Sequence, residues 1–202
     1  METIKSIIFD WGGVLIDDPA PGLVRYFAKA LGVKEDDYWK AYLKFRDDFQ
    51  KNLLSEEQFW TKMCGELNVP RPKVPSLWGD AFRAAYLPRA DMFSLVARLK
   101  KMGYKTALLS NTEVSAMRFF SQLQYDMFDL TVFSCAEGLA KPEREIYQLT
   151  LERLKVEPAQ AVFIDDRADY IAGAKDAGLN TILFQDVEQL KKELSILGVK
   201  TD

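Results

Sequence analysis

The sequence predicts an α/β fold: a parallel sheet covered by helices on both faces, with an all-helical segment inserted after the first strand. Two observations carry this prediction. A short apolar run, Ile7–Phe9, leads directly to Asp10, and the next convincing strand comes only near residue 105. From Pro88 onward, short apolar runs alternate with amphipathic stretches. This order is typical of parallel strands joined by right-handed helical crossovers.

The opening strand is predicted to end at Asp10. β-Branched and aromatic residues such as those of Ile7–Phe9 suit a strand buried on both faces. A carboxylate inside such a strand would be costly to desolvate, whereas one at its carboxyl end opens onto a ligand crevice. Gly12 and Gly13 follow, and glycine lets the backbone turn sharply and approach a ligand closely.

The segment from about residue 17 to residue 87 is predicted to contain helices only. Ser55 begins a capping-box pattern with Gln58, which marks the start of the third helix. Prolines 70 and 72 separate that helix from a fourth, expected over residues 76–86. The apolar residues that recur at helical spacing are Leu23, Phe27, Leu31, Tyr38, Tyr42, Phe45, Phe49, Phe59, Met63 and Leu67. We therefore expect a core of residues 1–16 and 88–202 and a helical cap of residues 17–87.

The second part of the chain is predicted to supply the remaining strands and the helices that cover the sheet. Gly103 and Gly178 stand where two of these helices should end. The expected strands are 105–109, 130–134, 161–164 and 181–184, and the expected helices are 91–102, 114–123, 143–154, 170–177 and 187–197.

Composition excludes several classes of protein. The formal net charge of −3 leaves no electrostatic footprint for nucleic acid. No stretch is apolar for long enough to span a bilayer, and the N-terminus lacks a signal-peptide pattern. Cys64 and Cys135 are read as reduced thiols, so we expect a cytoplasmic location. The chain has no histidine, which excludes Ser-His-Asp and Cys-His catalysis and histidine-ligated zinc.

Polar residues end several predicted strands, and they are the candidate site. Asp10 ends the first strand, Ser110-Asn111 the second, and Asp165-Asp166 another, while Lys141 precedes a helix near the end of a further strand. Taken singly, each is more typical of a cap, a turn or a solvated charge. Because the carboxyl ends of parallel strands converge on one crevice, the set in this order favours a site.

The chemistry of this set favours phosphoryl transfer. Three carboxylates in one pocket repel one another unless a cation neutralises them, and Mg²⁺ accepts carboxylates while keeping water and phosphate in its shell. A hydroxyl, backbone N–H groups and an ammonium suit a phosphoryl group. Asp10 can then attack phosphorus and form an aspartyl-phosphate, which water hydrolyses.

Four motifs together resemble those of the haloacid dehalogenase-like hydrolase superfamily. They are Phe-Asp10-Trp-Gly-Gly-Val-Leu, Leu-Leu-Ser110-Asn-Thr, Lys141-Pro-Glu-Arg-Glu-Ile-Tyr and Ile-Asp165-Asp166-Arg-Ala-Asp169. The resemblance covers nearly the whole chain. It implies a Rossmann-like core with an inserted helical cap, and a Mg²⁺-dependent phosphatase that acts on a small phosphorylated metabolite.

The resemblance also implies roles for individual residues. Asp10 is the nucleophile and a metal ligand, the main-chain carbonyl of Gly12 is a second ligand, and Asp166 is a third. Asp165 is a ligand or a neighbour of one. Ser110 and Lys141 hold the phosphoryl group, while Asp169 orients Lys141 or caps the following helix.

Two further residues are assigned to substrate binding. Asn111 is expected to bind the phosphoryl group beside Ser110. Trp11 follows the nucleophile immediately, so we expect its ring at the pocket mouth, where it can shield the reaction from water. Of the cap residues, Trp39, Arg46, Lys51, Trp60, Trp78 and Arg83 could reach a substrate, although aromatic residues at helical spacing are more often core.

Gly12 is a departure from the family pattern that bears on the chemistry. Phosphatases of this family usually carry a second Asp there, which protonates the leaving oxygen, and such a group is worth ~10²–10⁴-fold in rate. We favour a substrate whose leaving group needs little protonation, such as a sugar 1-phosphate or an acyl phosphate. A bacterial Asp-x-Gly subgroup that includes an α-glucose-1-phosphate phosphatase resembles this sequence. Alternatively, water or a cap residue supplies the proton.

Two rival functions remain open. One is a 2-haloacid dehalogenase, which would use the same Asp nucleophile without a metal, so Asp165 and Asp166 beside Asp10 argue against it. The other is a weakly catalytic binding or regulatory protein, which Gly12 favours and which the presence of Asp10, Ser110 and Lys141 disfavours.

Overall fold

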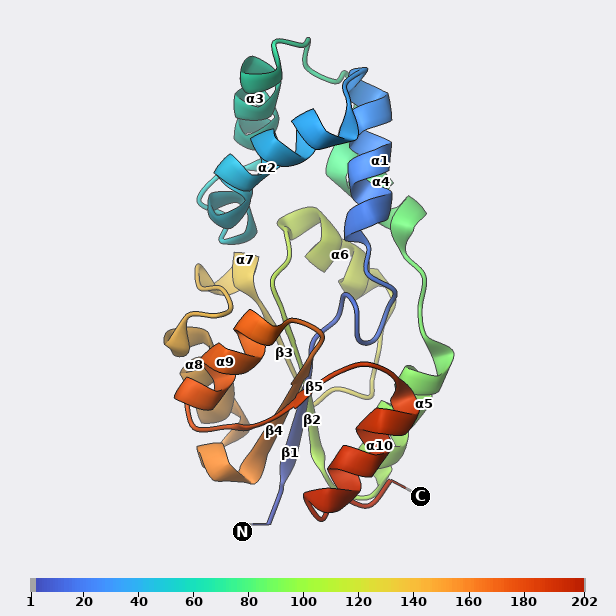
Figure 1. Cartoon of the computed structure of the whole chain (residues 1–202), viewed down its shortest axis with the longest axis vertical. Coiled ribbons are helices and arrows are strands. Elements are labelled where there is room, and N and C mark those ends of the chain that lie inside the picture. Colours follow the sequence, from blue (N-terminus) through green and yellow to red (C-terminus); the bar gives the residue numbers. More distant parts are fainter. Residues whose placement is uncertain (1–2, 202) are drawn as a thin grey trace.

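The computed structural model describes residues 3–201 and contains one five-stranded sheet (Figure 1). The strands are β1 (Ser6–Phe9), β2 (Lys105–Ser110), β3 (Leu130–Phe133), β4 (Ala161–Asp165) and β5 (Asn180–Leu183). All neighbours are parallel, in the order β3-β2-β1-β4-β5. The predicted α/β fold with a parallel sheet is confirmed.

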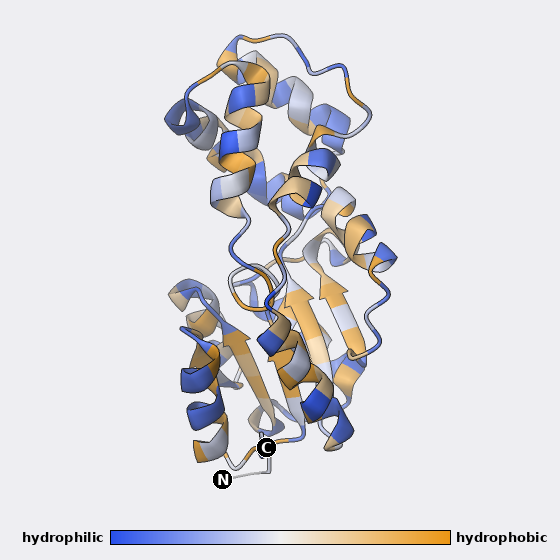
Figure 2. Ribbon diagram, turned by 90° about the vertical axis from the view of Figure 1, so that its right-hand side faces the viewer, coloured by the Kyte–Doolittle hydropathy of each residue, from blue (hydrophilic) through white to orange (hydrophobic). Residues whose placement is uncertain are grey.

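The two central strands are buried along their whole length. Every residue of β1 and β4 is buried, which accounts for their nearly continuous apolar sequences (Figure 2). Phe9 pairs with Ile164 in β4 and with Leu108 in β2. This register brings Asp10, Ser110 and Asp165 to the same edge of the sheet. The amide of Asp10 donates to the carbonyl of Ile164 at 2.9 Å, which holds the start of the loop against β4.

Helices cover both faces of the sheet. They are α5 (Ala90–Lys101), α6 (Val114–Gln122), α7 (Ser134–Glu137), α8 (Arg144–Leu154), α9 (Ala168–Asp176) and α10 (Val187–Ile196), with a 3₁₀ turn, η1 (Pro158–Gln160). Helices α5 and α10 pack with Ile7 and Phe9 on one face, and α8 and α9 pack with Ile8 and Phe163 on the other. Side chains of adjacent strand residues thus enter opposite cores, as a buried parallel sheet requires. The short helix α7 was not predicted, because Ser134 was assigned to the preceding strand.

Four helices follow β1: α1 (Ala20–Leu31), α2 (Glu35–Gln50), α3 (Glu56–Leu67) and α4 (Leu77–Ala85). They lie beyond the carboxyl ends of the strands (Figure 1). The predicted capping box is present, since the Ser55 side chain accepts from the amide of Gln58. Trp78 lies at the centre of their shared core, with ring centroids 4.8 Å from Phe27 and 4.9 Å from Phe49.

The two connections between the sheet and these four helices pair side by side. Ile16 and Pro88 form an antiparallel bridge, and the amide of Asp17 donates to the carbonyl of Leu87 at 2.9 Å. Arg89 donates to Asp17 at 2.8 Å and to the carbonyl of Gly13 at 3.0 Å. These contacts tie the loop after β1 to the return of the chain from α4.

Cys64 and Cys135 are both buried and unpaired. Within residues 3–201, no helix combines the length and the apolar character that crossing a bilayer requires.

Candidate active site

Lys141 and two carboxylates form a buried ion-pair cluster at the carboxyl edge of the sheet. The Lys141 Nζ lies 2.7 Å from an oxygen of Asp10 and 2.7 Å from an oxygen of Asp165. The side chains of Lys141 and Asp165 are fully buried, and that of Asp10 is 9% exposed. Burial alone would lower the pKa of Lys141, but the two carboxylates outweigh burial and hold this pKa above its ordinary value. The lysine therefore stays charged.

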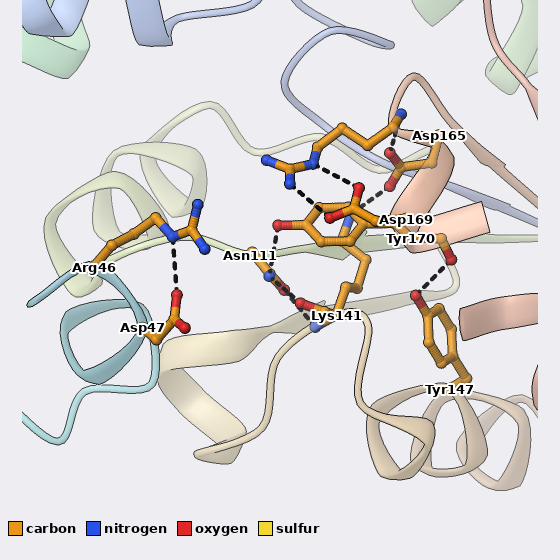
Figure 3. A network of polar contacts seen from close by, with 9 residues as sticks. Arg46, Asp47, Asn111, Lys141, Tyr147, Asp165, Asp169 and Tyr170 are labelled. Carbon is orange, nitrogen blue, oxygen red and sulfur yellow. Dashed lines mark hydrogen bonds and ion pairs between the residues drawn. The ribbon is translucent and has the colours of Figure 1, made fainter. Parts of the chain in front are cut away.

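The main chain and the side chain of Lys141 are both held in place (Figure 3). The side-chain amide of Asn111 donates to the carbonyl of Lys141 at 2.9 Å, and the amide of Lys141 donates back to Asn111 at 2.8 Å. The ammonium lies 4.8 Å from the ring centroid of Tyr170. The Asn111 amide also donates to the Tyr170 hydroxyl at 3.3 Å. This network sets where the ammonium points.

Asp165 and Asp166 differ in what they contact. One oxygen of Asp165 accepts from Lys141 at 2.7 Å, and the other accepts from the amide of Arg167 at 2.9 Å. Asp166 is exposed, and no other residue within 3–201 donates a hydrogen bond to its carboxylate. Asp165 is therefore occupied in holding Lys141, whereas Asp166 is available to a ligand.

Gly13 makes room for the carboxylate of Asp166. A Cβ at residue 13 would lie 2.2 Å from Asp166 Oδ2, which is well inside contact distance. Gly13 also has a φ of +81°, which a residue with a side chain adopts at a cost. The positive φ of Gly13 matches the predicted sharp turn, and the group that approaches its backbone closely is the Asp166 side chain.

Three acids could share one cation. Ligand atoms of Asp10, Asp165 and Asp166 all lie within 4.8 Å of one another. Burial raises the pKa of Asp10 to about 7, against the opposing effect of Lys141 and with a further increase from Asp165. The pKa of Asp166 is also raised, first by partial burial and then by Asp165. One lysine thus leaves the cluster short of positive charge, and a divalent cation would correct this deficit.

A cavity of about 400 Å³ opens above this cluster. Its floor includes Asp10, Ser110 and Lys141, and its opposite wall comes from helices α1, α2 and α4. Ser110 is 4% exposed, and its hydroxyl has no hydrogen-bond partner among the described residues. The wall residues include Leu23, Trp39, Tyr42, Gln50, Trp78 and Phe82. The structure therefore brings the predicted site residues Asp10, Ser110 and Lys141 to one cavity, which also has an aromatic wall.

The structure gives three of the predicted residues surroundings that differ from those expected. Trp11 lines the cavity, but its indole is 1% exposed and packs 5.0 Å from the Phe82 ring and 5.1 Å from the Phe120 ring, so the ring belongs to the core rather than to the cavity mouth. Asn111 uses its side-chain amide to bridge to Lys141 and Tyr170 rather than directing it toward a phosphoryl group. Asp169 pairs with Arg167 at 2.7 Å, while the ion-pair partners of Lys141 among residues 3–201 are Asp10 and Asp165.

Among the residues singled out within residues 17–87, the tryptophans lie in the core or along the cavity, and the basic residues pair with neighbouring side chains. Trp60 is 4% exposed and lies in the core, and Trp78 is 2% exposed and also lines the cavity. Trp39 is 38% exposed and lines the cavity too. Arg46 pairs with Asp47 at 2.9 Å, as Figure 3 shows, and Lys51 pairs with Glu143. Arg83 lies over the ring of Phe119.

Glu113 and Gln50 line the cavity and were not singled out from the sequence. Glu113 is 4% exposed and accepts from the Gln50 side-chain amide at 3.2 Å. In the sequence, Glu113 resembles any acidic residue at a helix start. Nothing in the local pattern indicates that the end of α2, more than 60 positions earlier, lies against it.

Comparisons with known proteins place this geometry among hydrolases. A family model described as "Hydrolase: haloacid dehalogenase-like hydrolase" matches residues 4–178. The chain is 32% identical to Phosphatase MT3486 of Mycobacterium tuberculosis over 216 residues, which cover 99% of this chain and 98% of that one. It is 31% identical to Acyl-CoA dehydrogenase family member 10 of Mus musculus over 206 residues, which cover 96% of this chain but 19% of that one. The chain spans only 19% to 38% of the length of the first four curated relatives it matches.

A solved structure shares the fold. The HAD family enzyme bt-2542 from Bacteroides thetaiotaomicron superposes with a TM-score of 0.81 at 22% identity, over 96% of this chain and 99% of that one. Another structure of the same enzyme is a complex with magnesium and inorganic phosphate.

Proposed function

Because the chain belongs to the haloacid dehalogenase-like hydrolase family, we propose that it is a Mg²⁺-dependent phosphatase that hydrolyses a small phosphorylated metabolite through Asp10. The observation that carries the proposal is the buried contact of Asp10 with Lys141, next to a free Asp166 and an unpartnered Ser110 hydroxyl. These groups are what a phosphoryl group and a divalent cation require side by side.

The donor set fits Mg²⁺. Its ligands in this chain would be the carboxylates of Asp10 and Asp166 and the main-chain carbonyl of Gly12, which are hard oxygen donors. Asp165 would hold Lys141 in place, since both of its oxygens already accept hydrogen bonds. When bound, the cation would supply positive charge that neutralises the acids and the phosphoryl oxygens. The relative complexed with magnesium and inorganic phosphate supports this choice of ion.

The residues divide the reaction between them. Ser110 and Lys141 bind phosphoryl oxygens and fix phosphorus in front of Asp10. An oxygen of Asp10 attacks phosphorus, the bond to the leaving oxygen breaks, and an aspartyl-phosphate forms. Water then attacks this phosphorus, which releases inorganic phosphate and restores the Asp10 carboxylate. Lys141 offsets the charge that develops on the phosphoryl oxygens in both steps.

Gly12 restricts the substrate. Without an acid at this position, the leaving oxygen takes its proton from water or from a cap residue, or it leaves as an anion. Substrates with good leaving groups suit such a site, so we infer a preference for sugar 1-phosphates or acyl phosphates over sugar 6-phosphates.

We further propose that residues 17–87 form a cap that covers the bound substrate. Helices α1, α2 and α4 already supply one wall of the cavity that contains Asp10. The paired connections at Ile16 and Pro88 would be the hinge of this cap.

A panel of phosphorylated metabolites tests the proposal. Purified protein is assayed with Mg²⁺ for release of inorganic phosphate from sugar 1-phosphates, sugar 6-phosphates and acetyl phosphate, beside the Asp10→Asn variant. We expect release by the wild type and loss of at least ~10³-fold in the variant, because the nucleophile is gone. Equal rates for the two proteins would refute Asp10 as the nucleophile, and no release from any substrate would favour a binding module.

A further inference from the structure

We propose that Glu113, supported by Gln50, recognises a hydroxyl group on the leaving portion of the substrate and so selects a hydroxylated, sugar-like phosphate ester. This inference rests on the proposed phosphatase function, and it names the substrate class of the same site.

Glu113 lies on the side of the cavity that the leaving group must occupy. Asp10, Ser110 and Lys141 form the floor and would hold the phosphoryl group. Glu113 stands three residues after Ser110 and faces the four-helix segment, because the Gln50 amide of α2 donates to it at 3.2 Å. The carbonyl of Gln50 accepts from the Ser134 hydroxyl at 2.7 Å, which fixes the end of α2 over the sheet.

The carboxyl of Glu113 lacks a cationic partner. It is 4% exposed, and within residues 3–201 neither a lysine nor an arginine forms an ion pair with it. Its neighbours are neutral or acidic: Tyr38, Tyr42, Glu56 and Cys135. The Gln50 amide and the Trp78 indole are hydrogen-bond donors beside it, but burial outweighs them, so the ionised carboxyl is costly to maintain. A ligand that brings hydrogen-bond donors to this position would remove that cost.

The protonation state of Glu113 suits a hydroxyl partner. Burial raises the pKa of Glu113 to about 7. Near neutral pH the carboxyl therefore exists in both forms, and it can accept from a hydroxyl or donate to one. An ammonium ligand would need the ionised form alone, so a hydroxyl is the better match.

The rest of the wall has the composition of a sugar site. The half-exposed ring of Trp39 offers an apolar surface for C–H groups, and the largely buried rings of Tyr42 and Trp78 line the cavity beside it. The carboxyl of Glu113 and the amide of Gln50 offer polar contacts for hydroxyls. The cavity volume of about 400 Å³ lies within the range of roughly 300–1,000 Å³ that small-molecule sites occupy.

The test compares a hydroxylated ester with one that lacks hydroxyls. For the wild type and for Glu113→Gln, kcat/KM is measured with D-glucose 1-phosphate and with acetyl phosphate, both with Mg²⁺. We divide kcat/KM for D-glucose 1-phosphate by kcat/KM for acetyl phosphate. This ratio is expected to be roughly 10- to 100-fold lower in Glu113→Gln than in the wild type, mainly through a higher KM for D-glucose 1-phosphate, because a hydrogen bond to a carboxylate is lost. Gln50→Ala should lower the ratio in the same direction. Glu66→Gln, which changes an exposed acid of α3, is the matched control and should leave the ratio unchanged.

A binding measurement separates this inference from the proposed function. In an Asp10→Asn background, D-glucose 1-phosphate is titrated against the fluorescence of Trp39 and Trp78, with and without Glu113→Gln. We expect weaker binding with the second substitution, and circular dichroism checks that each variant is folded. An inactive wild type that still shows Glu113-dependent binding would overturn the phosphatase proposal alone. An active wild type whose substrate ratio and binding do not respond to Glu113→Gln would overturn the role of Glu113 alone.

Discussion

The Nζ of Lys141 lies 2.7 Å from a carboxylate oxygen of Asp10, in an ion pair almost removed from solvent. Exposed ion pairs contribute little to stability, but a buried pair that loses one partner leaves an uncompensated charge in a poorly solvating environment. Lys141 has two such partners, since Asp165 lies at the same distance from its Nζ. The same side chain is therefore important for both stability and chemistry.

Replacing Lys141 should damage both properties. For Lys141→Met we expect the free energy of unfolding to fall by about 3–5 kcal/mol, because Asp10 and Asp165 lose their shared cation. Phosphatase activity should fall by at least ~10²-fold. Urea unfolding and initial rates measure the two effects. Lys192→Met, at an exposed position of α10, should change stability by less than about 0.5 kcal/mol. Equal stability of the two variants would contradict the role of the buried pair.

Mg²⁺ should stabilise the folded chain through Asp166. A ligand at 100 times its Kd adds about 2.7 kcal/mol, which raises Tm by several degrees in a chain of this size. We expect this rise for the wild type in thermal melts with and without Mg²⁺, and a much smaller rise for Asp166→Asn. Asp169→Asn is the matched control, because Asp169 pairs with Arg167 outside the acidic cluster. If Mg²⁺ raises the Tm of Asp166→Asn as much as that of the wild type, Asp166 is not a ligand of the ion.

Chelation separates the phosphatase from a dehalogenase that uses the same nucleophile. Dehalogenation by Asp10 would need no metal, and Asp165 next to it raises its pKa and so disfavours the charged nucleophile. EDTA should therefore abolish phosphate release, and added Mg²⁺ should restore it. Halide release from a 2-haloacid that persists in EDTA would instead support the dehalogenase.

Gly13 should tolerate no side chain. Gly13→Ala adds a Cβ that would lie 2.2 Å from Asp166 Oδ2, at a φ of +81°. We expect loss of Mg²⁺-dependent stabilisation and of activity, beyond the roughly 1–2 kcal/mol of left-handed backbone strain. Gly138→Ala isolates that strain, because Gly138 has a φ of +69° and open space around its Cβ position. If both variants keep full activity, the fit between Gly13 and Asp166 is unimportant.

An acid at residue 12 should widen the substrate range. Gly12→Asp places a carboxyl two residues after the nucleophile, so we expect hydrolysis of sugar 6-phosphates to rise by up to ~10²-fold, with little gain for acetyl phosphate. The added Cβ would lie 3.1 Å from Pro19 Cδ, a tight contact that Gly12→Ala tests alone. Steady-state rates on the two substrates decide the matter. An equal change for both would refute the leaving-group argument.

The sequence predicts the elements of this fold well where the local signals are strong. Helix α3 begins where Ser55 and Gln58 predict, because the capping box is a local interaction. Asp10 and Asp165 meet because parallel strands bring their carboxyl ends to one edge. The ends of most elements differ by one or two residues, since the last turns of helices are weakly determined.

The remaining features depend on contacts between distant segments. The ring of Trp11 is buried by α4 and α6, so its exposure could not be read from its place beside Asp10. Asn111 bonds to Lys141, thirty positions later, and this partner is visible only in three dimensions. What distinguishes Glu113 is the end of α2 packed against it, a contact between segments 63 positions apart.

The stability of the chain should depend on pH through Glu113. Its pKa is about 7 in the folded chain, mainly because of burial, against an ordinary value of 4.5. Between these values the unfolded chain releases a proton that the folded chain keeps, so the free energy of unfolding falls as pH rises. Above about pH 7 Glu113 is ionised in the folded chain as well, and the free energy of unfolding is then lower by the full amount, on the order of 3 kcal/mol.

Glu113→Gln removes this titration. The free energy of unfolding of both proteins is measured with urea at pH 5 and pH 8, in EDTA. From pH 5 to pH 8, Glu113→Gln should gain stability relative to the wild type, because its side-chain amide stays neutral. Asp10 titrates over a similar range, but it is present in both proteins and cancels in the difference. Tyr38, Tyr42 and Cys135 have raised pKa values and stay neutral over this window, while Glu56 also faces Glu113. Glu66→Gln should show no such divergence. A difference between wild type and Glu113→Gln that is the same at both pH values would mean that Glu113 is ionised in the folded chain throughout.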